Sequence, residues 1–417
     1  MTGTRPPESR TRAWVCLVGL ASFLGALVAL RGRELAPEDV ALVAMASLAG
    51  PIVLFDLLVV RVWRRASTGL SWEAGRRIAW PRVLVKLAGL ALTLGVLTLA
   101  YWALPEYERS LYEPFFALVS RYGPLALAVV VPGIVLTDRQ MVAPEDGLYQ
   151  AGLCAVGRWR SVDRRALGEH ARAWVIKGFF FPLMFVYLGA EIGMVTTTPI
   201  DGESSFLEWY ELLWSLAFAV DVVFSATGYL MSARLFDTHV ESSEPTVAGW
   251  VVALVCYDPF WGTLYDRYFR YDSDVAWGDW LAGHEGLRVA WGVTILALIS
   301  IYAWASVTFG LRFSNLTRRG ILTNGPYRFT KHPAYVAKNL AWWFVSIPFA
   351  VEGTWDERLR LCLLMLGVNL VYFLRAKTEE RHLSCDPTYV EYARWIDEHG
   401  IFRWLRWPGR RKSPTVE

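Results

Sequence analysis

The sequence predicts an all-α, polytopic integral membrane protein of about ten transmembrane helices, with both termini in the cytoplasm. Of its 417 residues, 54% are apolar and only 19% are charged, whereas soluble domains carry about 25% charged residues. The apolar residues form runs of about 17 to 25 residues, the length of a helix that crosses about 30 Å of hydrocarbon. Arginine and lysine gather in alternate segments between these runs, and this asymmetry sets the orientation.

Each apolar run is expected to form one span. The first run follows a short basic tail and precedes Arg31 and Arg33, so an uncleaved helix is expected rather than a removed signal peptide. The seventh run is short and carries Asp258 and Pro259 near its end, where a re-entrant hairpin is the alternative. The expected spans are Trp14–Leu30, Val40–Val60, Val83–Ala103, Phe115–Leu136, Trp174–Gly193, Leu212–Met231, Val247–Trp261, Val289–Phe309, Leu340–Val351 and Leu359–Leu374.

Basic residues mark the cytoplasmic side. Clusters of arginine and lysine lie between spans two and three, four and five, and eight and nine, whereas Arg109 stands alone between spans three and four. The cytoplasmic segments of membrane proteins carry the excess of basic residues. An even number of spans agrees with a basic C-terminal tail that contains Arg403, Arg406, Arg410, Arg411 and Lys412.

The formal net charge of +3 says little about binding partners, whereas the cysteines are more informative. The five cysteines stand singly, without a CxxC pair or metal-ligand spacing, so we expect no disulfide framework and no metal site. The glutamate and histidine at positions 379 and 382 have the spacing of a di-iron ligand pair, but no second copy exists. A nucleic-acid partner is not expected either.

The first polar block follows the eighth span and reads Gly325-Pro-Tyr-Arg-Phe-Thr-Lys-His-Pro-Ala-Tyr335. Its Gly-Pro pair indicates a turn, and Pro333 suits the first position of a helix. On that helix His332, Tyr335 and Asn339 share one face. A basic helix N-terminus of this kind suits an anionic group on a ligand. The alternative is that Arg328, Lys331 and Lys338 only anchor the helix among lipid headgroups.

The second polar block follows the tenth span and begins with Glu379 and Glu380. These adjacent carboxylates could bind ribose hydroxyls or a cationic group, or they could be a solvated helix end that pairs with Arg381. Asp386 is expected to cap a short amphipathic helix over Pro387–His399. That helix places Tyr389 and Tyr392 on one face, as a lid.

Three ionisable residues inside the spans, Asp56, Glu191 and Asp221, are costly in hydrocarbon and are therefore functional candidates. Asp221 is the most central of them. The aromatic stretch Tyr257–Tyr271 is expected to form an interfacial belt, with a substrate wall as the alternative. The sequence contains no P-loop, HEXXH, GxSxG or kinase signature, so any cofactor must be held by the membrane helices.

The two blocks, about 45 residues apart with a helical hairpin between them, resemble the isoprenylcysteine carboxyl methyltransferase family. Its superfamily also includes phospholipid N-methyltransferases and NADPH-dependent sterol reductases. The resemblance covers about residues 289 to 402. It divides the chain into N-terminal membrane helices of unassigned role, residues 1–285 with about seven spans, and a methyltransferase-like core, residues 286–417.

The resemblance implies a cytoplasmic pocket for S-adenosylmethionine that opens sideways to a lipidic or lipid-anchored acceptor, isoprenoid-like or phospholipid. It implies that Arg328 and Glu380 are catalytic. Lys331 departs from the family, which usually has arginine before His-Pro, and lysine lacks the bidentate geometry of arginine. The implied cofactor-binding residues are Tyr327, Lys331, His332, Pro333, Tyr335, Glu379, Glu380, Tyr389 and Tyr392.

Two other functions stay open from the sequence. An NADPH-dependent reductase of a lipid or sterol-like double bond would hold the 2′-phosphate with Arg328, Lys331 and Arg394. A membrane transporter would instead place its function at Asp56 and Asp221. The acceptor, the role of the N-terminal helices and the oligomeric state are not specified by these patterns.

Overall fold

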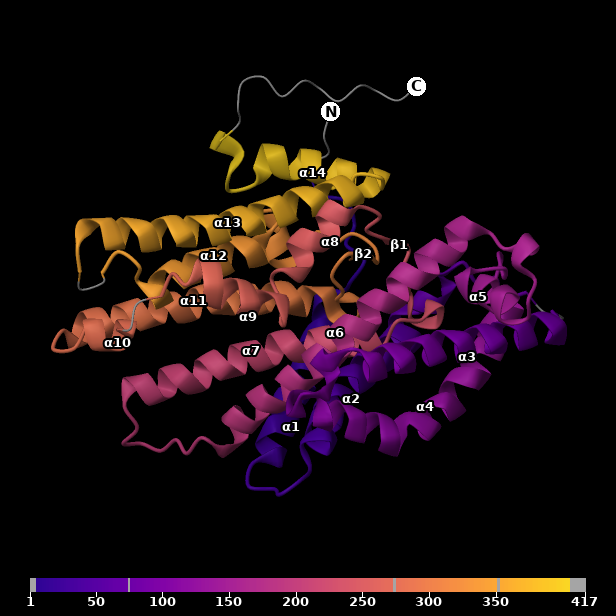
Figure 1. Ribbon diagram of the computed structural model, residues 1–417, viewed down its shortest axis with the longest axis horizontal. Helices are drawn as coiled ribbons and strands as arrows, with labels where there is room; N and C mark the ends of the chain where they lie inside the picture. Colours follow the sequence, from indigo (N-terminus) through magenta and orange to yellow (C-terminus); the bar gives the residue numbers. More distant parts are fainter. Residues whose placement is uncertain (1–4, 74–75, 273–274, 351–352, 406–417) are drawn as a thin grey trace.

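The computed structural model describes residues 5–73, 76–272, 275–350 and 353–405, and it is 74% helical with almost no strand (Figure 1). Short 3₁₀ and π turns join the helices. The only sheet in the described part of the chain is the antiparallel pair β1 and β2. The elements are α1 Ala13–Leu30, α2 Pro37–Phe55, α3 Trp80–Ala103, α4 Glu113–Gln140, α5 Gly147–Ala155, α6 Arg164–Thr197, α7 Phe206–Leu230, β1 Ser242–Ser243, α8 Val247–Leu254, α9 Phe260–Leu264, α10 Trp277–Trp280, α11 Glu285–Phe309, β2 Thr317–Arg318, α12 Pro333–Ser346, α13 Trp355–Leu383 and α14 Pro387–His399.

Eight helices of the described residues are long and apolar enough to cross a membrane, which confirms a multi-pass, all-α architecture. They are α1, α2 with its continuation to Val60, α3, α4 with the preceding turn, α6, α7, α11 with its continuation to Arg312, and α13. Many of their apolar side chains face outward, as expected where lipid is the surrounding solvent.

Two of the ten expected spans do not form helices of membrane length. The run Val247–Trp261 is divided between α8 and α9, and Asp258 and Pro259 lie at the break, where proline cannot donate a backbone hydrogen bond. The run Leu340–Val351 belongs to α12, which has 14 residues and ends at Ser346. Ile347 is left-handed, with φ 37°, and it precedes Pro348, which disfavours a continuing helix. Val351 lies outside the described residues.

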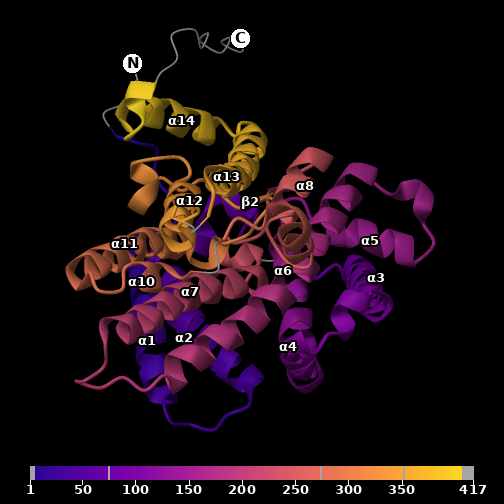
Figure 2. The same cartoon turned by 60° about the vertical axis from the view of Figure 1, so that its left-hand side comes forward.

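The main core joins helices from both halves of the chain. Buried apolar residues of α1, α2, α4, α6, α7 and α11 form one continuous cluster. α11, α12 and α13 lie alongside one another next to α7 (Figure 1), and α3, α4 and α5 form one flank of the bundle (Figure 2). The C-terminal helices are therefore packed on the N-terminal ones.

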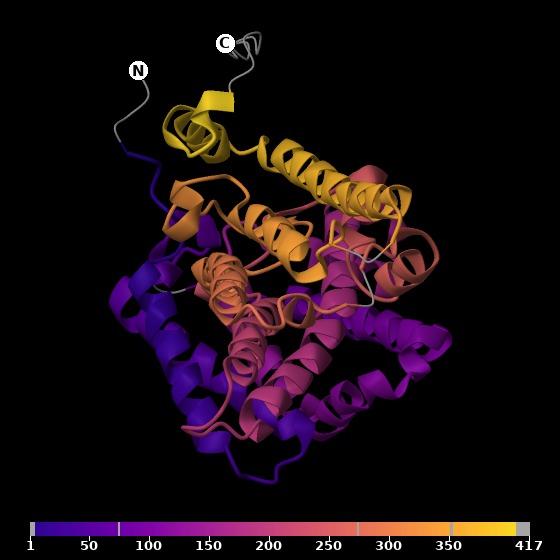
Figure 3. The same ribbon diagram turned by 90° about the vertical axis from the view of Figure 1, so that its left-hand side faces the viewer.

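The two ends of the described chain meet at one loop, residues 319–329, at the end of the bundle where α14 lies (Figure 3). Arg10 N–H donates to the carbonyl of Ile321 at 3.0 Å, and Ile401 N–H donates to the carbonyl of Phe329 at 2.9 Å. Thr11 Oγ1 donates to the carbonyl of Thr308, and Thr323 Oγ1 donates to that of Pro7. Residues 7–12, the amino-terminal strap, thus hold the loop that contains the start of the first polar block. The basic tail residues from Arg406 onward lie outside the described residues.

A buried ion cluster ties this end together. The carboxylate of Asp237 lies 3.1 Å from Arg65 and 3.2 Å from Arg312, and Arg10 lies 3.9 Å away. Ser67 also donates to it, at 2.8 Å. These partners come from three separate segments, so the acidic loop after α7 is neutralised by the basic segments that flank other helices.

Candidate functional site

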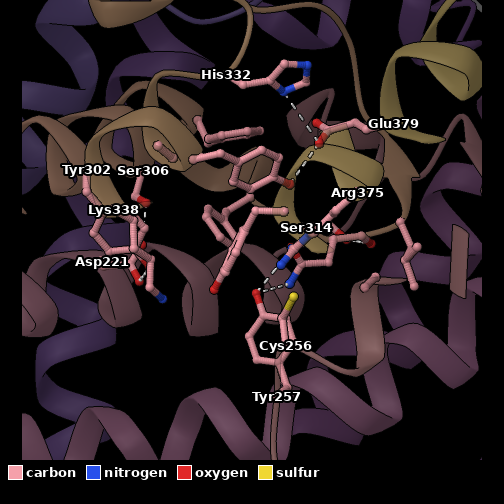
Figure 4. Close-up of a pocket in the computed structure, with 18 of the residues that line it drawn as sticks. Asp221, Cys256, Tyr257, Tyr302, Ser306, Ser314, His332, Lys338, Arg375 and Glu379 are labelled. Carbon is pink, nitrogen blue, oxygen red and sulfur yellow. Dashed lines mark hydrogen bonds and ion pairs between the residues drawn. The ribbon is translucent and has the colours of Figure 1, made fainter. Parts of the chain in front are cut away.

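The two polar blocks meet where α12 begins and α13 ends. His332 Nε2 lies 3.1 Å from Glu380 Oε1, and His332 Nδ1 lies 4.0 Å from Glu379 Oε2. The hydroxyl of Tyr335 donates to the same oxygen of Glu379 at 2.9 Å (Figure 4). The rings of His332 and Tyr335 stack with centroids 5.4 Å apart. This network places His332, Tyr335 and Glu379 in the lining of a cavity, with Glu380 behind His332.

Local sequence explains how the first block reaches this position. Pro333 is the first residue of α12, as its missing N–H favours, and it is buried. Gly325 has φ 55°, and a Cβ there would lie 2.6 Å from Thr308 Oγ1, so the turn against α11 requires glycine. The turn brings the ring of Tyr327 edge-on to Phe309, at 5.8 Å between centroids. Tyr327 is thereby fixed at the wall of the cavity.

The cavity has a volume of about 420 Å³, within the usual range of small-molecule sites. Five of the residues implied by the resemblance line it: Tyr327, Lys331, His332, Tyr335 and Glu379. The opposite wall comes from the N-terminal helices α6 and α7 and from residues 244–261. Both parts of the chain therefore build one site.

A smaller cavity of about 60 Å³ adjoins the first and shares Tyr327, His332 and Glu379 with it. Tyr389 and Tyr392 of α14 line this annex, and Asp386 caps α14 as expected. Tyr392 donates to the carbonyl of Tyr327 at 2.8 Å, whereas the buried hydroxyl of Tyr389 has no hydrogen-bond partner among the described residues. Burial raises the pKa of both tyrosine hydroxyls, so both carry a proton at neutral pH.

Some residues singled out from the sequence lie elsewhere. Arg328 and Arg394 are exposed and line neither cavity. Glu380 contacts His332 and Lys377 instead of lining the cavity. Asp56 is buried but also lines neither cavity.

Lys331 reaches the cavity, but its ammonium is paired with Asp397 of α14 at 2.9 Å. The three cations expected at a 2′-phosphate are therefore not gathered around the cavity. The aromatic stretch is divided: Tyr257 and Trp261 line the cavity, whereas Tyr268 is exposed.

Arg375 also lines the cavity, although no sequence motif marked it. It is 7% exposed and donates to Asn315 Oδ1 at 2.6 Å and to the hydroxyl of Tyr257 at 3.3 Å. Its guanidinium lies 5.2 Å from the ring centroid of Tyr335. Among the described residues no carboxylate forms an ion pair with it, so this buried cation lines the cavity without a direct ion-pair partner. A charged residue one turn before Glu379, next to an apolar span, was the signal that could have found it.

A second polar group lies on the other side of the cavity. Asp221 on α7 accepts hydrogen bonds from Ser306 and, at 2.5 Å, from Tyr302, both on α11. The ammonium of Lys338 on α12 lies 5.2 Å from the centroid of the Tyr302 ring. Figure 4 shows these four side chains together, apart from His332, Glu379 and Arg375.

Comparison with known proteins gives no further guide: no family model, no curated protein and no solved structure matches this chain. Function is therefore inferred from the geometry and chemistry of the cavity.

Proposed function

We propose that this protein is an integral membrane methyltransferase that uses S-adenosylmethionine and modifies a lipidic or lipid-anchored acceptor, isoprenoid-like or phospholipid. One observation carries the proposal: the two blocks that resemble the isoprenylcysteine carboxyl methyltransferase family meet at a cavity large enough for a cofactor. Tyr335 bonds Glu379, and His332 bonds Glu380, across 44 and 48 residues of sequence.

The chemistry of the cavity fits S-adenosylmethionine. Arg375, a buried cation without a carboxylate partner, suits the carboxylate of the ligand. Glu379 can accept hydrogen bonds from ribose hydroxyls or from an ammonium group. The faces of Tyr335 and Tyr327 suit a sulfonium cation. The unpartnered hydroxyl of Tyr389 offers one further donor in the annex.

The bound cofactor would supply an electrophilic methyl group with a good leaving group already in place. The protein must then align donor and acceptor and exclude water. His332 holds Glu380, and Tyr335 holds Glu379, so the acidic end of α13 is fixed before a ligand arrives. Arg328, although expected to be catalytic, lies at the surface, and we assign it no contact with the reacting groups in this arrangement.

The membrane topology belongs to the same proposal. We place the amino-terminal strap, the loop 319–329 and α14 in the cytoplasm, because the basic segments flank them. The strap and α14 lie at the same end of the bundle, which agrees with an even number of spans between them. In this arrangement α12 and the pair α8 and α9 enter the bilayer only part of the way, and irregular backbone at that depth is tolerated where it lines a cavity.

The test is calorimetric titration of the detergent-purified protein with S-adenosylhomocysteine and, in parallel, with NADPH. We expect micromolar binding of S-adenosylhomocysteine that is weakened about tenfold in Glu380→Ala. Glu357→Ala is the matched control, because Glu357 is exposed at the other end of α13. Binding of NADPH alone would replace this proposal with the reductase. Binding of neither ligand would overturn both enzyme proposals and favour a transporter.

A further inference from the structure

The polar group on the α7 side of the cavity joins a carboxylate, Asp221, to the hydroxyls of Tyr302 and Ser306. We propose, building on the methyltransferase function, that the acceptor is a protic nucleophile, an amine or a hydroxyl, and that its proton passes through Tyr302 to Asp221. Asp221 lies in the N-terminal part of the chain, which the family resemblance does not cover. The inference therefore concerns this protein's own helices.

The surroundings of Asp221 are polar but uncharged at contact distance. Asp221 is 6% exposed, and each of its carboxylate oxygens accepts one hydroxyl hydrogen bond, from Ser306 and from Tyr302. No ion pair with it occurs among the described residues. An ionisable residue inside a membrane-spanning helix costs free energy, and such residues mark functional sites. Asp221 is therefore better explained as part of the chemistry than as part of the packing.

Tyr302 and Ser306, whose hydroxyls contact Asp221, are both lining residues of the cavity. A proton released inside the cavity can reach the carboxylate through one hydrogen-bonded hydroxyl. Lys338 strengthens the path through Tyr302, because its ammonium faces the ring of that residue and that of Trp342, at 5.2 and 5.4 Å. This positive charge stabilises negative charge that develops on the tyrosine oxygen.

The proposed proton relay lies in the same cavity as the proposed site of the methyl donor at Glu379, which is called the donor end below. Tyr335 contacts Glu379 at the donor end, and Lys338 lies one turn further along the same helix, α12. The helix thus fixes the relay relative to the donor end. A methyl donor bound at Glu379 and an acceptor held at Tyr302 would face each other across this space.

The proposed step conserves atoms and charge. The acceptor heteroatom forms a bond to the methyl carbon, and its bond to hydrogen breaks. The bond between that carbon and the sulfonium sulfur breaks, and its electron pair stays on sulfur as a neutral thioether. The hydroxyl of Tyr302 takes the acceptor proton and gives its own proton to Asp221. A carboxylate acceptor has no proton to lose and would bring a second negative charge beside Asp221.

The experiment measures transfer of radiolabelled methyl from S-adenosylmethionine to three amphiphiles of equal chain length: dodecylamine, dodecanol and dodecanoic acid. We expect transfer to the amine or to the alcohol, and the two arms show which, with little transfer to the acid. Asp221→Asn and Tyr302→Phe should lower kcat about 100-fold, the usual contribution of a proton-transfer group. The acceptor KM and the affinity for S-adenosylhomocysteine should change by less than about threefold.

Matched controls are Asp279→Asn and Tyr268→Phe, which change exposed residues that do not line the cavity. If Asp221→Asn fails to fold, Ser306→Ala and Tyr302→Phe each remove one hydrogen bond and keep the carboxylate. Three results would overturn the proposal: unchanged kcat in Tyr302→Phe, preferred methylation of the acid, or no transfer to any amphiphile by protein that binds S-adenosylhomocysteine. Failure to bind that ligand is seen before an acceptor is added, and it overturns the methyltransferase function itself.

Discussion

His332 Nε2 and Glu380 Oε1 lie 3.1 Å apart although 48 positions separate the two residues in the chain. The contact joins the start of α12 to the end of α13. It also links the two sequence blocks on which the functional proposal depends.

Removing either partner of this contact should weaken ligand binding. We expect His332→Gln and Glu380→Gln each to lower the affinity for S-adenosylhomocysteine about tenfold, with a coupling energy of about 1 kcal/mol in the double variant. Lys377→Met is the control, because the exposed pair of Lys377 with Glu380 contributes little. Calorimetric titration of the four proteins measures the coupling, and strictly additive losses would contradict it.

Arg375 should recognise the amino-acid part of the ligand. Arg375→Met is expected to lower the affinity for S-adenosylhomocysteine by about 2 kcal/mol, the scale of a charged hydrogen bond. The affinity for methylthioadenosine, which lacks the carboxylate, should stay the same. Equal losses for both ligands in a parallel titration would show that Arg375 supports the cavity without touching that group.

Asp237→Asn should destabilise the folded protein. The substitution leaves Arg65 and Arg312 beside a neutral side chain in a buried site, and breaking a buried ion pair costs about 3 to 5 kcal/mol. The unfolding temperature in detergent should fall clearly below that of the wild type. Asp279→Asn, an exposed change, should leave it unchanged. Equal unfolding temperatures for Asp237→Asn and Asp279→Asn would refute the structural role of the cluster.

The attachment of α14 should depend on acidity. Burial alone would raise the pKa of the Asp386 carboxyl, but hydrogen bonds from Thr388 and the charge of Arg318 outweigh it and lower the pKa. A lowered pKa in the folded state means that the stabilisation is complete above the ordinary value of about 3.9 and is lost as the pH falls through the folded value.

Hydrogen exchange measured by mass spectrometry can check this expectation. Exchange of α14, corrected for the intrinsic rate, should rise as the pH falls below about 4 in the wild type. In Asp386→Asn, which keeps the helix cap, α14 should exchange faster at neutral pH and respond less to acid. The same pH dependence of α14 exchange in both proteins would contradict a role of Asp386 in holding this helix.

The sequence predicted the local features of the site well. The start of α12 at Pro333, the cap at Asp386 and the bounds of α14 are confirmed, because each depends on a few neighbouring residues. The architecture of apolar helices is confirmed for the same reason, since hydropathy alone identifies them.

The features that the sequence did not predict depend on packing between distant segments. The apolar composition predicted that the ninth span continues through Pro348, whereas α12 ends at Ser346. Nothing in the pattern around Asp221 indicated that Tyr302 and Ser306 would meet it, because α7 and α11 are separated by more than 50 residues. The exposure of Arg328 likewise follows from the turn that it ends, since neighbours in a motif need not face the same way.

The amino-terminal strap also has a consequence for the order in which the protein is assembled. Its residues bind groups that lie 297 to 316 positions later in the chain. A ribosome makes those groups long after the strap has emerged, and contacts between distant residues form late in folding. The strap is thus made well before the groups that fix it. The loop 319–329, which carries Tyr327 and precedes His332, therefore reaches its final form only when the strap binds it.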